Sequence, residues 1–247
     1  GAGATVTIEI GTNALAGATG DSQITNPATS TSYQIDLLVG ADDTGSTRVA
    51  IVDAVTVTAS VDTLFTFTVG AVASGTAVTG SDTTSVLPTA TTIPFGQLEA
   101  LTAKSAAQTL EVSTNAANGF VVTVQADQQL LSANGADIDG FANGNYTSTP
   151  GAWSSPTGLP TDEDTFGHWG LSSTDATMDG SDPYSGGTSF VSASTTPVEV
   201  FRHDGPADGS TAGQGTAEVI YKVEISALQE AATDYTATLT YVATPVF

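Results

Sequence analysis

The chain contains no cysteine and very few basic side chains. Its 247 residues include four lysines and arginines against 26 aspartates and glutamates, which gives a formal net charge of −22 at pH 7. Without cysteine the protein cannot be stabilised by disulfides. Without a basic surface it cannot neutralise phosphate groups, so nucleic acid and anionic membrane surfaces are both excluded as expected partners.

Long apolar runs are also missing. No stretch approaches the roughly 18–20 apolar residues that a membrane-spanning helix requires, so we expect no membrane span. Hydrophobic residues nevertheless make up 40% of the chain, which excludes an intrinsically disordered protein. The first residues, GAGATVTIEI, carry no initiator methionine, and we interpret this start as the end left by signal-peptide removal. We therefore expect a secreted protein, extracellular or at the cell surface.

Apolar and polar residues alternate with a period of two throughout the chain, and threonine is common on the polar side. This pattern is typical of half-buried β-strands. The expected strands cover residues 5–10, 31–39, 49–61, 64–69, 91–95, 108–113, 120–126, 198–201, 217–225 and 235–243, whereas residues 100–107 are expected to form a loop. The sequence therefore predicts an all-β fold, most simply an antiparallel β-sandwich.

Residues 127–197 differ from the rest of the chain. They are rich in glycine, and they hold both tryptophans and most of the acidic clusters. A structureless loop of this length is uncommon in a compact domain. We expect a loop-rich insertion that projects from the sandwich and contains short strands near residues 166–171 and 189–192. The predicted organisation is an N-terminal strand and flexible hinge over residues 1–20, followed by the sandwich over residues 21–247.

Two groups of aspartates are candidates for a structural calcium site, the only cofactor that the sequence suggests. Short acidic loops with nearby glycines can supply the oxygen ligands that Ca²⁺ prefers. The alternative is that these side chains form Asx-turns on a solvated face. The candidate ligands are Asp137, Asp139, Asp175, Asp179 and Asp182.

Catalytic signatures are weak. The two histidines, His168 and His203, have no cysteine with which to complete a zinc site, and neither is accompanied by a Gly-x-Ser-x-Gly motif. We expect both to be structural and the protein not to be an enzyme. The aromatic residues Phe166 and Trp169 beside the acidic run 162–164 allow a sugar-binding surface, but burial in a small core is the usual place for such side chains.

Lys222 is one of only two lysines in the chain. Strand periodicity places it on the outward face of its strand with Glu218 and Glu224, so we expect an ordinary ion pair. A covalent cross-link between a lysine and an asparagine or aspartate is the alternative.

Two segments carry a resemblance to a known family. The stretch TAKSAAQTLEVSTNAANGFVVTVQAD (102–127) and the C-terminal strands over residues 223–245 resemble a family of uncharacterised secreted proteins of candidate-phylum bacteria. This resemblance covers roughly residues 50–247 and implies a cell-surface β protein. In architecture, the threonine-rich, cysteine-free sandwich is also similar to pilin-like filament subunits assembled by donor-strand complementation.

The N-terminal strand is the candidate assembly element. Val6, Ile8 and Ile10 lie on one face of the alternating segment, and the following residues, GTNALAGATG (11–20), have the composition of a flexible hinge. Insertion of such a strand into a neighbouring copy is a form of β-augmentation, and repeated head-to-tail contacts build a filament. The predicted function is a structural subunit of an extracellular filament or pilus, with identical subunits as partners. The alternative is a monomeric adhesin or carbohydrate-binding module that contacts surface glycans or a host cell.

Overall fold

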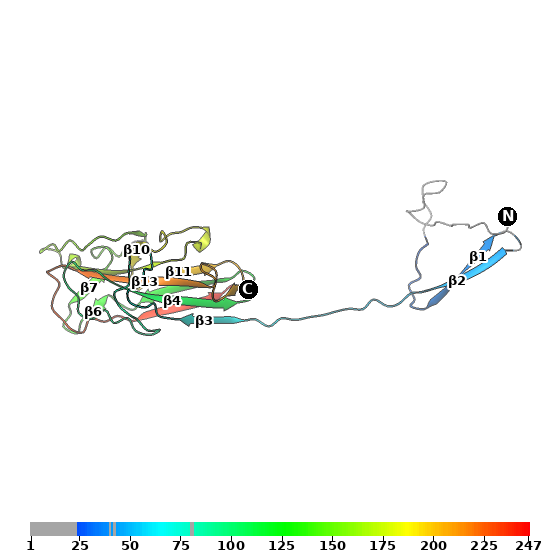
Figure 1. The fold of residues 1–247 in the computed structure, drawn as a ribbon, viewed down its shortest axis with the longest axis horizontal. Helices are drawn as coiled ribbons and strands as arrows, with labels where there is room; N and C mark the ends of the chain where they lie inside the picture. The colour runs from blue at the N-terminus through cyan, green and yellow to red at the C-terminus, as the bar shows by residue number, and fades with distance from the viewer. Residues whose placement is uncertain (1–23, 40, 42, 80–81) are drawn as a thin grey trace. The chain divides into compact units, whose positions relative to one another are not determined.

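The computed structural model describes residues 24–39, 41, 43–79 and 82–247, and it is all-β (Figure 1). No α-helix occurs among these residues, and the sheets are mainly antiparallel, which confirms the predicted fold class and is consistent with a β-sandwich. The chain divides into two compact units, Gly1–Val61 and Asp62–Phe247. This boundary lies well beyond the expected end of the N-terminal segment at residue 20.

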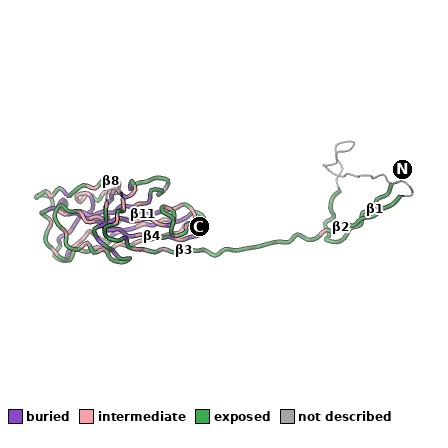
Figure 2. Tube along the Cα trace, in the orientation of Figure 1, coloured by how far each residue is buried: buried purple, intermediate pink, exposed green. Residues whose placement is uncertain are grey.

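The first unit contains one β-hairpin. Strand β1 (Ser32–Val39) pairs with β2 (Asp43–Ala50) in an antiparallel register that joins Ser32 to Ala50. None of the unit's described residues is buried, and Figure 2 shows the hairpin in the colour of exposed residues. The part of this unit that the structure describes therefore has no core of its own. An isolated two-stranded hairpin of this kind is only marginally stable in water.

The sequence prediction for this hairpin was correct for one strand and wrong for the other. Residues 31–39 match β1, but of the expected strand over 49–61 only the first two residues are in a strand, because β2 lies earlier in the chain. The register pairs Val39 with Asp43, so the polar stretch beginning at Asp43 enters the sheet instead of forming a turn. Strand formation requires a pairing partner, and residues 52–61 have none among the described residues.

The second unit is built on two sheets. The larger has nine strands, and its longest path runs β12-β4-β13-β9-β10-β8. Its strands are β3 (Phe65–Val69), β4 (Lys104–Thr114), β6 (Leu130–Leu131), β7 (Asp137–Gly140), β8 (Gly151–Ala152), β9 (Gly167–Ser173), β10 (Ser189–Ser192), β12 (Ala207–Asp208) and β13 (Thr216–Ile225). The smaller sheet has the order β11-β5-β14, from β11 (Val198–His203), β5 (Phe120–Ala126) and β14 (Leu239–Pro245). Two 3₁₀ helices, η1 (Glu163–Thr165) and η2 (Met178–Gly180), lie in the connections.

The main core lies between these two sheets. Alternate residues of β4, β9 and β13 pack against the inward residues of β5 and β11, as period-two strands require. Phe120 of β5 and Phe201 of β11 meet edge to face, with 4.8 Å between ring centroids. Purple, buried trace is confined to this unit in Figure 2.

The large sheet is also covered on its other face. A second, smaller core contains Ile220 of β13 and Ala107 of β4, packed with Phe141 and Phe190 and flanked by Trp153. Strand β13 is therefore enclosed on both faces, as its nearly continuous burial shows. This second layer is what positions the site described below.

Residues 127–197 do not project from the sandwich as expected. Strand β9 from this segment pairs with β13 over seven residue pairs and lies between β13 and β10 in the large sheet. The short strands predicted near 166–171 and at 189–192 are present as β9 and β10. Their place in the sheet depends on pairing with β13, which lies far away in the sequence.

Several other predictions are resolved by the strand bounds. Strands expected at 64–69, 120–126 and 217–225 correspond to β3, β5 and β13, whereas the expected strand at 91–95 is absent. Residues 104–107 belong to β4 and not to a loop, because they pair with residues 220–223 of β13. No helix in the described part of the chain is long and apolar enough to cross a membrane.

Candidate functional site

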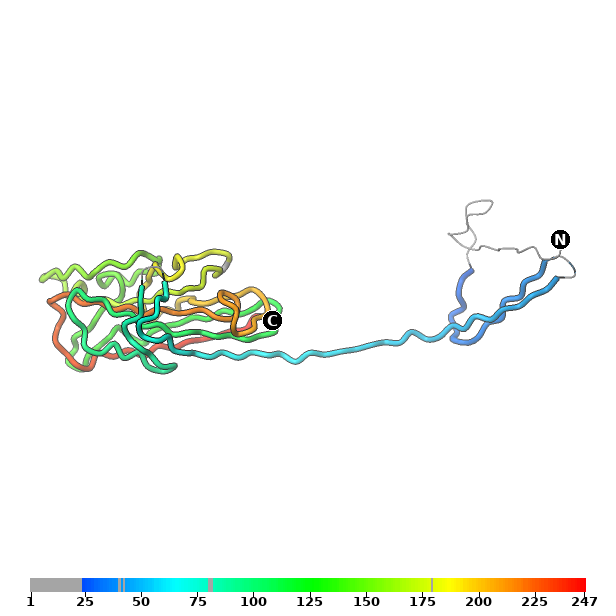
Figure 3. Tube along the Cα trace, in the orientation of Figure 1, coloured from blue at the N-terminus to red at the C-terminus, as the bar shows by residue number. Residues whose placement is uncertain are grey.

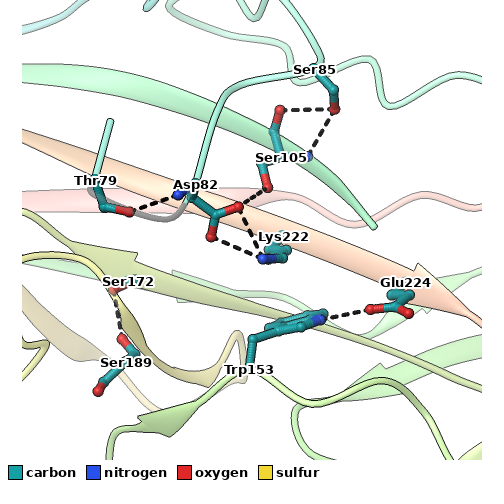
Figure 4. Close-up of polar contacts among 9 residues, drawn as sticks. All are labelled: Thr79, Asp82, Ser85, Ser105, Trp153, Ser172, Ser189, Lys222 and Glu224. Carbon is teal, nitrogen blue, oxygen red and sulfur yellow. Dashed lines mark hydrogen bonds and ion pairs between the residues drawn. The ribbon is translucent and has the colours of Figure 1, made fainter. Parts of the chain in front are cut away.

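The most unusual side-chain arrangement in the described residues is an enclosed ion pair on β13. Lys222 Nζ lies 3.0 Å from Asp82 Oδ1 and 2.9 Å from Asp82 Oδ2 (Figure 4). The two side chains are only 13% and 12% exposed. The chain has only four lysines and arginines in all, and one of them, Lys222, is thus largely removed from solvent.

Asp82 is held in place by the segment that precedes β4. Its backbone N–H donates to Thr79 Oγ1 at 3.0 Å, and its Oδ1 also accepts a hydrogen bond from Ser105 Oγ at 3.2 Å. The backbone N–H groups of Ser85 and Val86 both donate to the Ser105 carbonyl. These bonds fix the segment beside the start of β4, which in turn pairs with β13 at Lys222.

Two aromatic rings pack against the lysine of this ion pair. Lys222 Nζ lies 5.3 Å from the ring centroid of Trp153 and 5.4 Å from that of Phe190, both within cation–π range. Phe141 stacks on Trp153 with 4.8 Å between centroids. Trp153 Nε1 donates to Glu224 Oε2 at 2.8 Å, and Figure 4 shows this bond at the nitrogen end of the indole.

His168 completes the aromatic cluster without an open nitrogen. Its Nδ1 accepts from the backbone N–H of Asn143 at 3.2 Å, and its Nε2 lies 2.9 Å from the Ser154 carbonyl oxygen. A ring that accepts at Nδ1 and donates at Nε2 is neutral. Burial lowers the pKa of His168, in agreement with this form. The side chain is fully buried, so it cannot reach a bulk-solvent substrate.

Strand periodicity predicted that the face of β13 carrying Lys222 is exposed, and this prediction is wrong. Lys222 and Glu224 were expected on an outward face, but Glu224 is only 4% exposed, because the second layer covers this face of β13. Asp82 and Trp153 were not identified as partners of Lys222 at all. The one available signal was the rarity of lysine in so acidic a chain.

The candidate calcium ligands do not form one group. Asp137 and Asp139 lie on β7, Asp179 lies in η2, and Asp175 and Asp182 lie in the connections on either side of η2. Asp175 is fully buried and accepts from the backbone N–H groups of Thr177 and Arg202, so it organises a turn. In the described part of the chain, no three His, Asp or Glu side chains form a group that could hold a metal ion.

A cleft of about 380 Å³ lies beside the small sheet. Residues of β14 and the segment before it line one side, and Ile93 and Phe95 line the other. Trp169 contributes its indole and is 2% exposed, with no hydrogen-bond partner for Nε1 among the described residues. Because Trp169 and His168 are enclosed, they cannot form the sugar-stacking surface that the sequence left open.

The outer strand of the small sheet is β14. It pairs with β5 from Leu239↔Ala126 to Pro245↔Phe120, and in the described residues its other edge has no strand beside it. In Figure 3 it is the red trace that runs along the green trace of β5. Such an edge presents backbone groups that can pair with another strand.

Residues 52–61 belong to no strand of the structure and are drawn in light blue in Figure 3. Val52, Val55, Val57 and Val61 are 81% to 87% exposed. The donor strand expected from the sequence, with Val6, Ile8 and Ile10, lies outside the described residues.

No family matches. Comparisons with protein-family models and with curated proteins both find no counterpart for this chain. Any functional proposal must therefore come from the chain's own geometry.

His168 has both ring nitrogens engaged in hydrogen bonds, and neither Lys222 nor Asp82 is among the residues that line the cleft described above.

Proposed function

We propose that the protein is a structural subunit of an extracellular filament, in which each copy donates an extended segment to the β-sandwich of the next. The observation that carries this proposal is the segment over residues 52–61, which belongs to no strand among the described residues. It has the alternation of a strand, yet its valines are exposed and its backbone has no strand partner among the described residues. An exposed apolar strand is an aggregation hazard unless a partner covers it.

The composition of this segment favours donation to another copy. Between Ile51 and Leu64 the chain contains no glycine or proline, the strongest chain-reversing residues, and its turn-forming residues are Asp53, Ser60 and Asp62. Asn115 holds the end of the segment at the start of β3. Its Nδ2 donates to the Asp62 carbonyl and its Oδ1 accepts from the Leu64 N–H, both at 2.8 Å. A return to its own sandwich would need a reversal within this β-branched stretch.

The acceptor in this proposal is the open edge of β14 with its adjoining cleft. The edge offers backbone partners, and Ile93, Phe95 and Leu239 supply apolar walls for side chains of an added strand. Covering Val55, Val57 and Val61 would contribute about 5–9 kcal/mol at 1.5–3 kcal/mol per side chain. This gain has to exceed the entropic cost of association, which backbone pairing along β14 helps to offset.

The test compares one substitution on each face of the segment. Val57→Asp places a charge on the face formed by Val55, Val57 and Val61, where it would be buried without a partner, and assembly should be lost. Thr58→Asp adds the same charge on the opposite face and should leave assembly intact. Ile8→Asp asks whether the N-terminal strand predicted from the sequence takes part as well. Sedimentation velocity and negative-stain imaging of the full chain measure the result.

A concentration-independent monomer for the unaltered chain would refute the filament. So would equal assembly of the Val57→Asp and Thr58→Asp chains. Protection of residues 53–61 from hydrogen exchange in such a monomer would show that the segment pairs within its own chain.

A monomeric surface module that binds a glycan is the second candidate. The observation in its favour is the cleft itself, whose lining includes polar residues such as Thr91, Thr92 and Tyr241. Binding of a glycan to the monomer, lost in Tyr241→Ala with the fold preserved, would favour this function over the filament.

A further inference from the structure

The Lys222–Asp82 pair has the geometry of two groups ready to condense. The amine nitrogen lies within 3.0 Å of both carboxylate oxygens, and both residues are anchored by neighbours on either side. Because these atoms are already in contact, the reaction needs no movement of the backbone and benefits from a high effective concentration.

The pair is enclosed by the second layer of the unit. Trp153 and Phe190 lie within cation–π range of Lys222 Nζ, and the Lys222 and Asp82 side chains are only 13% and 12% exposed. Amide formation begins with transfer of a proton from the amine to the carboxylate, and the direct contact between the two groups provides the path for this transfer. An enclosed ion pair is also weak support for stability by itself, so its presence in a layer of aromatic residues calls for another role.

We propose that Lys222 and Asp82 join into an intramolecular amide bond. A proton passes from Nζ to Oδ2, and the nitrogen lone pair then attacks Cγ to form the C–N bond. A second proton moves from nitrogen to Oδ2, the Cγ–Oδ2 bond breaks, and water leaves with that oxygen. Oδ1 remains as the amide oxygen, and nitrogen keeps one hydrogen. Atoms and electrons balance without an oxidant, a reductant or a co-reactant.

Ser105 is the positioning residue for this step. Its Oγ donates to Oδ1, the oxygen on which negative charge develops as nitrogen attacks. Glu224 acts through Trp153, because it accepts a hydrogen bond from the indole Nε1 and so holds the ring in place. Neither residue is consumed.

The bond would close a loop between positions 140 residues apart in a chain that has no cysteine. It would fasten the segment before β4 to the central strand β13, and it would restrict the unfolded chain in the way that a disulfide does. This inference does not depend on the proposed function, since the cross-link forms within one copy.

Intact-mass spectrometry of the denatured full chain tests the bond directly. We expect a mass lower than that of the sequence by one water molecule. Trypsin gives an independent readout, because the chain has only four basic residues, Arg48, Lys104, Arg202 and Lys222. Cleavage after Lys222 should fail, and peptide 49–104 should remain joined to peptide 203–247.

Three variants make the test specific. Lys222→Arg keeps the positive charge but should restore the full mass and tryptic cleavage. Lys104→Arg is the matched control, since Lys104 Nζ contacts only backbone carbonyls in the described residues and its replacement should leave the water deficit unchanged. Asp82→Asn should still cross-link, with loss of ammonia in place of water.

The proposal is overturned if the folded, unaltered chain shows its full mass and normal cleavage after Lys222. It is overturned equally if the water deficit persists in Lys222→Arg, because the lost water would then come from another site. Circular dichroism of each variant establishes that the fold is retained, and a Ser105→Ala chain should show slower formation of the bond with the same end point.

Discussion

Asp139 gives the protein a stability that depends on pH. This residue of β7 is only 5% exposed, and its Oδ1 accepts a hydrogen bond from Tyr146 Oη at 3.0 Å. Burial raises the pKa of Asp139 from 3.8 to about 6, and the negative charges of Asp137, Asp164 and Glu163 act in the same direction. The Tyr146 hydrogen bond opposes this shift but does not cancel it.

The sign of the effect follows from linkage. A carboxyl whose pKa is higher in the folded state binds its proton more tightly there, so folding is favoured while the group is protonated. The contribution is fully present below the unfolded pKa of 3.8 and is lost as the pH rises through about 6. At 1.36 kcal/mol per pKa unit, the difference amounts to about 3 kcal/mol, and residual contact with solvent reduces it to about 2 kcal/mol.

Asp139→Asn isolates this contribution, because the amide oxygen can still accept from Tyr146 and the charge is gone. We expect the variant to be more stable than the unaltered chain by about 2 kcal/mol at about pH 8 and to lose most of that advantage at about pH 4. Urea unfolding at a series of pH values measures it. The chain's other carboxylates also titrate, so the difference between the two chains is the informative quantity.

Asp137→Asn is the control. It removes the same charge from a more exposed position on the same strand. If the stability difference between Asp139→Asn and the unaltered chain stays constant over this pH range, or if Asp137→Asn reproduces it, the reasoning from burial fails.

Two further predictions concern the sandwich. Gly119→Ala should lower the stability by several kcal/mol more than Gly75→Ala. Both glycines have positive φ (74° and 83°), and the backbone strain of an alanine there costs about 1–2 kcal/mol at either position. Only a Cβ at position 119 would also clash, because it would lie 1.7 Å from the His203 carbonyl oxygen. Thermal unfolding checks this, and equal losses would contradict it. Tyr221→Phe should cost about 1 kcal/mol in urea unfolding, because the Tyr241 hydroxyl, 2.6 Å away, loses its donor. An unchanged midpoint would show that this buried pair contributes nothing.

The sequence by itself determined the fold class and many strands. Period-two alternation is a local property, so residues 120–126 predicted β5 and residues 189–192 predicted β10 without knowledge of their partners. The scarcity of basic residues likewise singled out Lys222 before any partner was known. None of these signals requires knowledge of which segments pair in space.

Only the tertiary structure decided which strands pair and which faces are covered. Residues 49–61 have good alternation, but beyond Ala50 they have no strand beside them among the described residues, so most of this stretch is not a strand. The outward face predicted for β13 is buried because Phe190 and Trp153, distant in sequence, pack over it. Asp82 meets Lys222 across 140 residues for the same reason. Alternation fixes that a strand has two faces, whereas long-range packing determines what each face contacts.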